Sequence, residues 1–453
     1  MSTRSTTDPV TDFIIAACAP RDASHASGEL GEADAILATH PEVATADIHC
    51  AAILGDEVGV RRFLAEDPAN ATAKGGPHGW DALTHLCFSR YLRLDPSRSE
   101  RFVSAATALL DAGASANTGW WEADHQPEPE WEPVLYGAAG VAHHEPLTRL
   151  LLERGANPRD VEVVYHAPES NDNAALEALV ESGKLSEEDL TLMLIRKHDW
   201  HDYDGQKYLL EHGANPNLTW RHGLNALHHA LSRDNALRSF ELLLDHDADP
   251  LLVARGLSGV ARAAREGRSD VLELFERRNV SMKLAGVDRL IAACARGDTA
   301  GVRSITGNEP ALIGELMAMG GNLLARFSGT GNPPGVRALL ELGVDVAAPF
   351  EEGDGYFGEP KGSLAIHVAA WRACPEVVKL LIEHRSPVDV ADPSGRTPLM
   401  LAIKACTDSY WTEYCSPETL RMLLEAGATT KVIPYPTGHE KVDQVLRQYR
   451  ASE

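Results

Sequence analysis

The chain has 453 residues and carries 42 Lys and Arg against 66 Asp and Glu, which gives a net charge of −24. This surplus of negative charge argues against a nucleic-acid partner, which requires a clustered basic face, and against docking on an anionic membrane. The composition, with 44% hydrophobic and 24% charged residues, is that of a folded protein, and the length exceeds the roughly 250–300 residues at which one core stops growing, so we expect several domains or an elongated repeat array.

The N-terminal residues and the cysteines indicate where the chain resides. The first ten residues are polar and lack the charged-then-apolar pattern of a signal peptide, and no apolar run approaches the ~18 residues of a membrane span. No two of the seven cysteines form a CxxC pair, and Cys18, Cys294, Cys374 and Cys406 each follow Ala in an apolar stretch. Because this usage favours free, buried thiols over a disulfide framework, we expect a cytoplasmic protein.

One short pattern recurs along the chain: two apolar residues, two polar residues, and Gly-Ala or a close substitute. It reads LLDAGASAN at 109–117, LLERGANP at 151–158 and LLEHGANPN at 209–217, with weaker copies at 243–250, 339–346 and 423–430. The apolar positions before each copy recur at helical spacing, which predicts a short helix that ends at the glycine.

A second pattern precedes the first one. It reads GWDALTHLCFSR from Gly79, GLNALHHALSRD from Gly223, GSLAIHVAAWRA from Gly362 and SGRTPLMLAIKA from Ser394. Together the two patterns resemble the ankyrin repeat, in which a Gly turn and T-P-L-H-x-A open an inner helix and an outer helix ends in L-L-x-x-G-A. The resemblance covers most of residues 13–432 and implies an all-α solenoid of about a dozen helix-turn-helix units of ~33 residues, several of them degenerate or with long finger-loop insertions.

The physics of such units agrees with this fold. One short helix pair cannot bury its own apolar face, so neighbouring pairs must stack into a continuous core. We expect a flexible N-terminus at 1–12, the repeat solenoid at 13–432 with room for a break between two repeat blocks near 281–335, and a C-terminal capping helix within 433–453. Val442, Val445, Leu446 and Tyr449 would form the apolar face of that cap.

Two insertions, 120–132 and 350–360, lie between an outer helix and the next inner one, where the resemblance implies projecting finger loops beside a concave surface. Five of the eight tryptophans fall at inferred finger positions, and segment 122–132 holds five acids and no Lys or Arg. We therefore predict an aromatic, acidic concave groove whose ligand-binding residues are Trp80, His85, Trp120, Trp121, Glu122, Asp124, Trp131, Trp220, His222 and His229. A second patch is expected at 351–357.

Such a groove fits a basic peptide or protein as its partner, and a small polar ligand held by cation–π contacts or by stacking on indole is the other candidate. The alternative arrangement is that the tryptophans only pack finger against finger. The alternative function is an enzyme with a pocket between finger loops, in which His85 or His229 acts as a base and carboxylates such as Glu122 and Asp124 act on a sugar-like or cationic substrate.

The remaining motifs favour structural roles. Segment 197–205, KHDWHDYDG, would place His198 and His201 on one helical face as a metal pair, but the repeat pattern favours a solvated turn between helices, so no metal is expected. The GDGYFG sequence at 353–358 is judged an accidental match to a nucleotide-binding loop, and no other cofactor motif occurs. His228 and His367 occupy the family's histidine position, where a structural hydrogen bond is expected.

Overall fold

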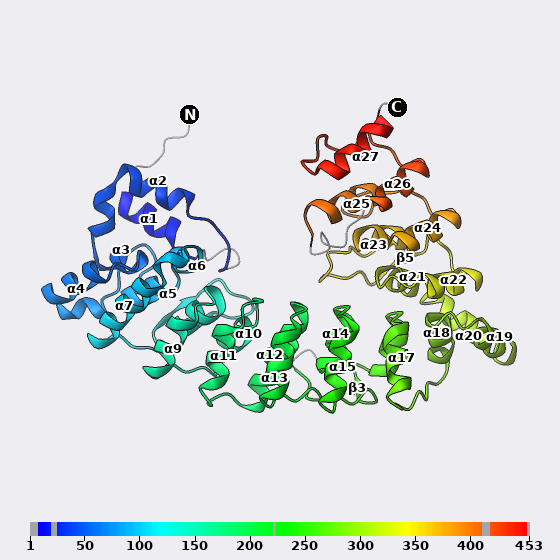
Figure 1. Cartoon of the computed structure of the whole chain (residues 1–453), viewed down its shortest axis with the longest axis horizontal. Helices are drawn as coiled ribbons and strands as arrows, with labels where there is room; N and C mark the ends of the chain where they lie inside the picture. The colour runs from blue at the N-terminus through cyan, green and yellow to red at the C-terminus, as the bar shows by residue number, and fades with distance from the viewer. Residues whose placement is uncertain (1–7, 20–24, 221–222, 410–416, 451–453) are drawn as a thin grey trace. The chain divides into compact units, whose positions relative to one another are not determined.

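The computed structural model describes residues 8–19, 25–220, 223–409 and 417–450 (Figure 1). Contacts between residues divide the chain into two compact units, Met1–Trp220 (unit 1) and Arg221–Glu453 (unit 2). Both units are built from short helices, and the described residues include three two-stranded antiparallel sheets. The expectation of an all-α array of helix-turn-helix units is confirmed within each unit.

Unit 1 contains thirteen α-helices among its described residues, together with short helical turns and one β-hairpin. Its elements are α1 (Pro9–Ala17), α2 (Gly31–Thr39), η1 (Pro41–Thr45), α3 (Ile48–Ile53), α4 (Glu57–Glu66), η2 (Pro68–Ala71), α5 (Ala82–Cys87), α6 (Arg90–Leu94), η3 (Pro96–Arg98), α7 (Ser99–Asp111), β1 (Gly119–Glu122), β2 (Glu130–Pro133), α8 (Val134–Tyr136), η4 (Gly137–Val141), α9 (Glu145–Glu153), α10 (Val161–His166), α11 (Ala174–Glu181), α12 (Glu187–Asp199) and α13 (Tyr203–Glu211).

The helices of unit 1 stack in two rows. The outer helices α4, α7, α9 and α11 contact one another in that order, while α3 packs on α5 and α10 packs on α12. Leu109 of α7 and Leu151 of α9 come from the recurring Leu-Leu pattern, and both are fully buried. Stacking thus gives each short amphipathic helix the apolar partner that it lacks alone.

Unit 2 repeats this arrangement. Its elements are α14 (Ala226–Ser232), α15 (Leu237–Asp245), β3 (Val253–Ala254), β4 (Leu257–Ser258), α16 (Gly259–Arg265), α17 (Ser269–Arg277), α18 (Val287–Ala295), α19 (Thr299–Asn308), α20 (Ala311–Met317), α21 (Gly320–Gly329), α22 (Pro333–Glu341), β5 (Pro349–Phe350), β6 (Ser363–Leu364), α23 (Ala365–Trp371), α24 (Pro375–Glu383), α25 (Pro398–Thr407), α26 (Glu418–Glu425) and α27 (Glu440–Arg450). Inner helices α21, α23 and α25 stack in order, as do outer helices α22, α24 and α26 (Figure 1).

The recurring sequence patterns have clear structural causes. Gly155 ends α9 at a φ of +89°, and the N–H of Ala156 returns to the carbonyl of Leu151 at 2.9 Å, which closes the helix. At the start of an inner helix, Asn225 caps the N–H of His228 at 3.0 Å. The Nε2 atom of His228 lies 3.0 Å from the carbonyl oxygen of Leu257 in the next hairpin, so this histidine has the structural role that was expected.

Both ends of the array carry helices. α27 packs on α26 and buries Val442, Val445 and Leu446, as a cap requires. α1 begins at Pro9, inside the stretch that was expected to be flexible. The contact division falls between residues 220 and 221, whereas the break near 281–335 stays a prediction.

The expectations about the cysteines and about membrane-spanning helices can be compared with the structure. Cys406 is disulfide-bonded, so its prediction as a free thiol is wrong, while Cys18, Cys294 and Cys374 are free. Within the described part of the chain, no helix is long and apolar enough to cross a membrane.

Candidate functional site

The first insertion folds into a β-hairpin with two different faces. β1 and β2 pair in antiparallel register, with Trp120 opposite Glu132 and Trp121 opposite Trp131. Successive side chains of a strand point to opposite faces, so the two adjacent tryptophans must separate. Trp120 is 4% exposed and Trp121 is 61% exposed. We call the side of Trp120, Glu122, Glu130 and Glu132 the inner face of the hairpin, and the side of Trp121 and Trp131 its outer face.

Trp120 on the inner face belongs to a closed aromatic cluster. Its ring centroid lies 4.9 Å from that of Trp80 and 5.8 Å from that of Phe88. Trp80 is only 2% exposed. The prediction that all five finger tryptophans line an open groove is therefore wrong for Trp80 and Trp120, which pack against each other because strand alternation turns Trp120 inward.

The inner face also contacts a histidine, His25, that no sequence pattern predicts. His25 Nε2 lies 3.2 Å from Glu122 Oε1, and His25 Nδ1 lies 2.8 Å from Tyr136 Oη. The side chains of His25 and Glu122 are 10% and 13% exposed. Burial lowers the pKa of His25, although the neighbouring Glu122 opposes that shift. His25 lies outside the repeat pattern and 97 residues from Glu122, so no local signal points to this contact.

Glu132 is the most unusual acid of the hairpin. It is 1% exposed, and its Oε2 atom has no hydrogen-bond partner among the described residues. Burial, reinforced by the nearby carboxyl groups of Glu162 and Glu122, raises the pKa of Glu132 to about 9. One donor atom from each of His25, Glu122 and Glu132 lies within 4.8 Å of the other two. A buried cluster with this donor set can hold a cation.

A protonated histidine lies next to this cluster. His166 contacts Glu162 at 3.2 Å and Glu169 at 3.0 Å. Although burial lowers its pKa, the hydrogen bonds to these two carboxylates raise the pKa of His166 to about 9. The ring of His166 also lies 5.0 Å from that of Tyr136. His166 therefore lies between two carboxylates, of which Glu169 also pairs with Arg196.

The outer face of the hairpin is open and aromatic. The rings of Trp121 and Trp131 lie 5.3 Å apart at an interplanar angle of 59°, and Trp131 is half-buried. The connection between the strands presents the exposed carboxylates of Asp124 and Glu128. Trp121 is therefore exposed on the outer face, and two exposed carboxylates lie on the connection between the strands; whether these residues bind a ligand stays a prediction.

The remaining predicted site residues differ in their burial. His85 is fully buried, its Nδ1 lies 3.0 Å from the carbonyl oxygen of Asp81, and burial lowers its pKa to about 3. It is therefore inaccessible as a general base for an external substrate. Trp220 in unit 1 and His229 in unit 2 are half-buried, and His222 lies outside the described residues.

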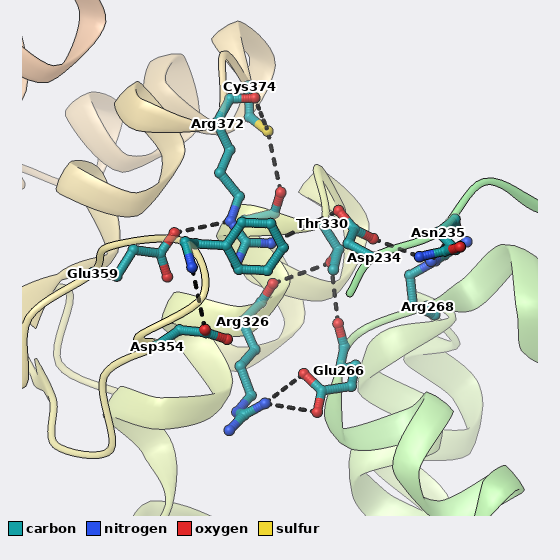
Figure 2. Close-up of polar contacts among 12 residues, drawn as sticks. Asp234, Asn235, Glu266, Arg268, Arg326, Thr330, Asp354, Glu359, Arg372 and Cys374 are labelled. Atoms are coloured by element: carbon teal, nitrogen blue, oxygen red, sulfur yellow. Dashed lines mark hydrogen bonds and ion pairs between the residues drawn. The ribbon is translucent and has the colours of Figure 1, made fainter. Parts of the chain in front are cut away.

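The second insertion forms part of an indentation of about 300 Å³ in unit 2, a volume that includes open solvent. Figure 2 shows polar contacts among residues of this region. Arg372 donates to Glu359 Oε1 at 2.8 Å and lies over the ring of Phe357 at 3.4 Å. Arg326 contacts Glu266 at 2.5 Å and donates to Glu352 at 2.7 Å. Both guanidinium groups therefore form ion pairs with carboxylates of the same unit, and these ion pairs hold the insertion in contact with the helices.

The insertion itself is a closed turn. The backbone groups of Asp354 and Glu359 exchange two hydrogen bonds of 2.8 Å. Phe357 is 7% exposed and Tyr356 is 39% exposed, so the expected patch at 351–357 is wrong for Phe357. β5 and the turn after it lead to β6, and the glycine pattern does not open a helix, which agrees with its being an accidental match.

The paired histidines of segment 197–205 are separated by a helix end. His198 is buried in the last turn of α12, whereas His201 has a φ of +51° between α12 and α13. Lys197 and Asp202 pair at 2.7 Å, and Asp202 caps the N–H of Gly205 at 3.0 Å. Residues 200–202 form a turn between α12 and α13, as the repeat pattern predicted. Lys197 and His198 belong to α12 and are buried, so the expectation of a solvated segment is wrong for them.

Comparisons with known proteins agree with the fold. Residues 324–433 match a family model described as ankyrin repeats in three copies. A stretch of 97 residues is 33% identical to the BTB/POZ domain and ankyrin repeat-containing protein NPR5 of Oryza sativa subsp. japonica, and it covers 20% of this chain and 18% of that protein, so the match spans about a fifth of that relative's length. The crystal structure of the human ASB11 ankyrin repeat domain aligns with 52% of this chain and 98% of its own at 20% identity, with a TM-score of 0.23. The chain is an ankyrin repeat-containing protein, with the repeats matched by the family model at residues 324–433.

Proposed function

We propose that this chain is a binding scaffold that recognises a basic peptide segment of a protein partner on the outer face of the β1–β2 hairpin. Ankyrin repeats are generally scaffolds for protein–protein interaction, and stacked repeats display extended binding surfaces. The observation that carries the proposal is Trp121, a large aromatic side chain that is 61% exposed on a projecting hairpin.

The exposed indole ring of the outer face is held in place by a neighbouring ring. The ring of Trp121 packs against that of Trp131 with centroids 5.3 Å apart and planes tilted by 59°, so it is supported before a partner arrives. A side chain that is already ordered loses less conformational entropy on binding. Tryptophan is also the residue type that most often dominates the binding energy of an interface.

Charge favours a basic partner. Asp124 and Glu128 are exposed on the connection between β1 and β2, and segment 122–132 contains no Lys or Arg. A guanidinium or ammonium group can lie over an indole face and meet these carboxylates at the same time. The net charge of −24 further raises the rate at which a basic segment encounters the protein.

The proposal is tested by peptide selection followed by measured affinities. A random peptide library is selected on the full chain, and fluorescence anisotropy then gives the dissociation constants of the enriched peptides. We expect these peptides to be rich in Arg and Lys and to lose at least about tenfold in affinity with Trp121→Ala. Trp200→Ala is the matched control, because Trp200 is also exposed, at 38%, but lies outside the hairpin.

Two results would contradict the proposal. One is enrichment of acidic or neutral peptides. The other is equal affinity of the basic peptides for the wild type and for Trp121→Ala, with both variants verified as folded by circular dichroism.

A further inference from the structure

We propose that the inner face of the β1–β2 hairpin binds a divalent transition-metal ion through His25 and one carboxylate oxygen each of Glu122 and Glu132. This site is independent of the outer-face recognition proposed above, because it uses the opposite side of the strands. It brings together a residue near the N-terminus and two residues of the first insertion.

The donor geometry is close to that of a metal site. One donor atom from each of the three side chains lies within 4.8 Å of the other two. Bonds of about 2.0–2.2 Å from a zinc ion to nitrogen and oxygen place tetrahedral ligands roughly 3.3–3.6 Å apart. Small rotations about side-chain bonds suffice to contract the set around an ion, and one coordination position remains for water.

The buried carboxyl group of Glu132 has an oxygen without a hydrogen-bond partner among the described residues, which favours a cation as its ligand. Glu132 is 1% exposed, and its Oε2 atom has no partner within the described part of the chain. A buried carboxylate that lacks hydrogen bonds is costly, and proteins pair such groups with a charge or a metal. A metal ion bound to the Glu132 carboxylate would displace its proton and supply the positive charge and the contact that this buried group lacks.

The hairpin register gives an independent argument. Glu122 lies directly opposite Glu130 on the two strands. Like charges at opposed positions destabilise a strand pair. The ion pairs shown for these two acids are with histidines, His25 at 3.2 Å and His125 at 4.0 Å. A divalent cation on the inner face would convert this cross-strand repulsion into attraction.

The surroundings of His25 fit a metal ligand. Ligating histidines characteristically donate their second ring N–H to an oxygen acceptor, which fixes the tautomer. The Nδ1 atom of His25 lies 2.8 Å from Tyr136 Oη, so an N–H at this position can donate to the phenol oxygen. Nε2, on the side of Glu122, is then the lone-pair donor for the ion.

The test is metal binding by the full chain after removal of bound metal with a chelator. Zn²⁺ and Mn²⁺ are each titrated against a chromophoric competitor for the wild type, Glu132→Gln and His25→Gln. We expect one site in the wild type for at least one of the two ions, with affinity at least tenfold lower in both variants. His40→Ala is the matched control, because His40 and Glu42 also lie 3.2 Å apart but are exposed and have no third donor close by among the described residues.

Circular dichroism verifies that the variants are folded, and anomalous diffraction from crystals grown with the bound ion locates the site. A peak between His25, Glu122 and Glu132 is expected. The inference is overturned if the wild type binds neither ion, if Glu132→Gln and His25→Gln bind as tightly as the wild type, or if the peak lies elsewhere.

Discussion

The two adjacent tryptophans of β1 provide a sharp test of the hairpin geometry, because replacing each one with Ala should have very different effects on stability. Trp120 is 4% exposed and contacts Trp80 and Phe88, whereas Trp121 is 61% exposed. A tryptophan offers roughly 250 Å² of surface, so Trp120 buries about 240 Å² and Trp121 about 100 Å². At about 25 cal/mol per Å², these areas correspond to upper bounds of about 6 and 2.5 kcal/mol.

Measured losses for a buried Trp→Ala replacement are about 3–5 kcal/mol. We therefore expect Trp120→Ala to destabilise unit 1 by about 3–5 kcal/mol, and Trp121→Ala to cost at least about 2 kcal/mol less. A chain of stacked repeats need not unfold in two states, so hydrogen exchange read peptide by peptide is the suitable assay. Trp120→Ala should reduce protection in α5, β1 and β2 by a factor of about a hundred or more, if exchange there reports on unit 1 unfolding.

An equal loss of protection in the two variants would refute the assignment of inner and outer faces, and so would a larger loss with Trp121→Ala. Because Trp120 is part of the core, only Trp121 is a clean probe of recognition.

Three further outcomes are expected. Arg372→Ala should destabilise unit 2 by about 3–5 kcal/mol, because it leaves the carboxylate of Glu359 buried and unpaired, and urea unfolding should show that Glu359→Gln restores much of the loss. The pKa of His166 is raised from an ordinary 6.5 to about 9, so its contribution to the free energy of unfolding is fully present below pH 6.5 and is lost as the pH rises through 9. His166→Asn should flatten that part of the plot of stability against pH, and an NMR titration of the ring should give the pKa directly. Affinity for the selected basic peptides should fall as the salt concentration rises, whereas an unchanged affinity between 50 and 500 mM salt would argue against recognition through Asp124 and Glu128.

The repeat architecture could be predicted because its signals are local. The Leu-Leu-x-x-Gly pattern around Leu151 and Gly155 specifies an amphipathic helix and its end within a few residues. The capping of His228 by Asn225 is equally local. Such signals recur in every clear copy of the repeat, so the copies together strengthen the prediction of the fold.

The candidate site could be predicted only in part. The acidic, aromatic character of the first insertion was evident, and Trp121 and Asp124 are exposed as expected. The inward turn of Trp120 follows from strand alternation, which was missed because the insertion was interpreted as a loop. The placement of His25 depends on tertiary packing between segments 97 residues apart, for which the sequence offers no pattern.

The most direct measurement of the central claim is the dissociation constant of one selected basic peptide for the wild type, Trp121→Ala and Trp200→Ala, taken side by side by fluorescence anisotropy. We predict a loss of at least about tenfold for Trp121→Ala and an unchanged value for Trp200→Ala. Equal affinities for all three proteins would contradict recognition at the outer face of the hairpin.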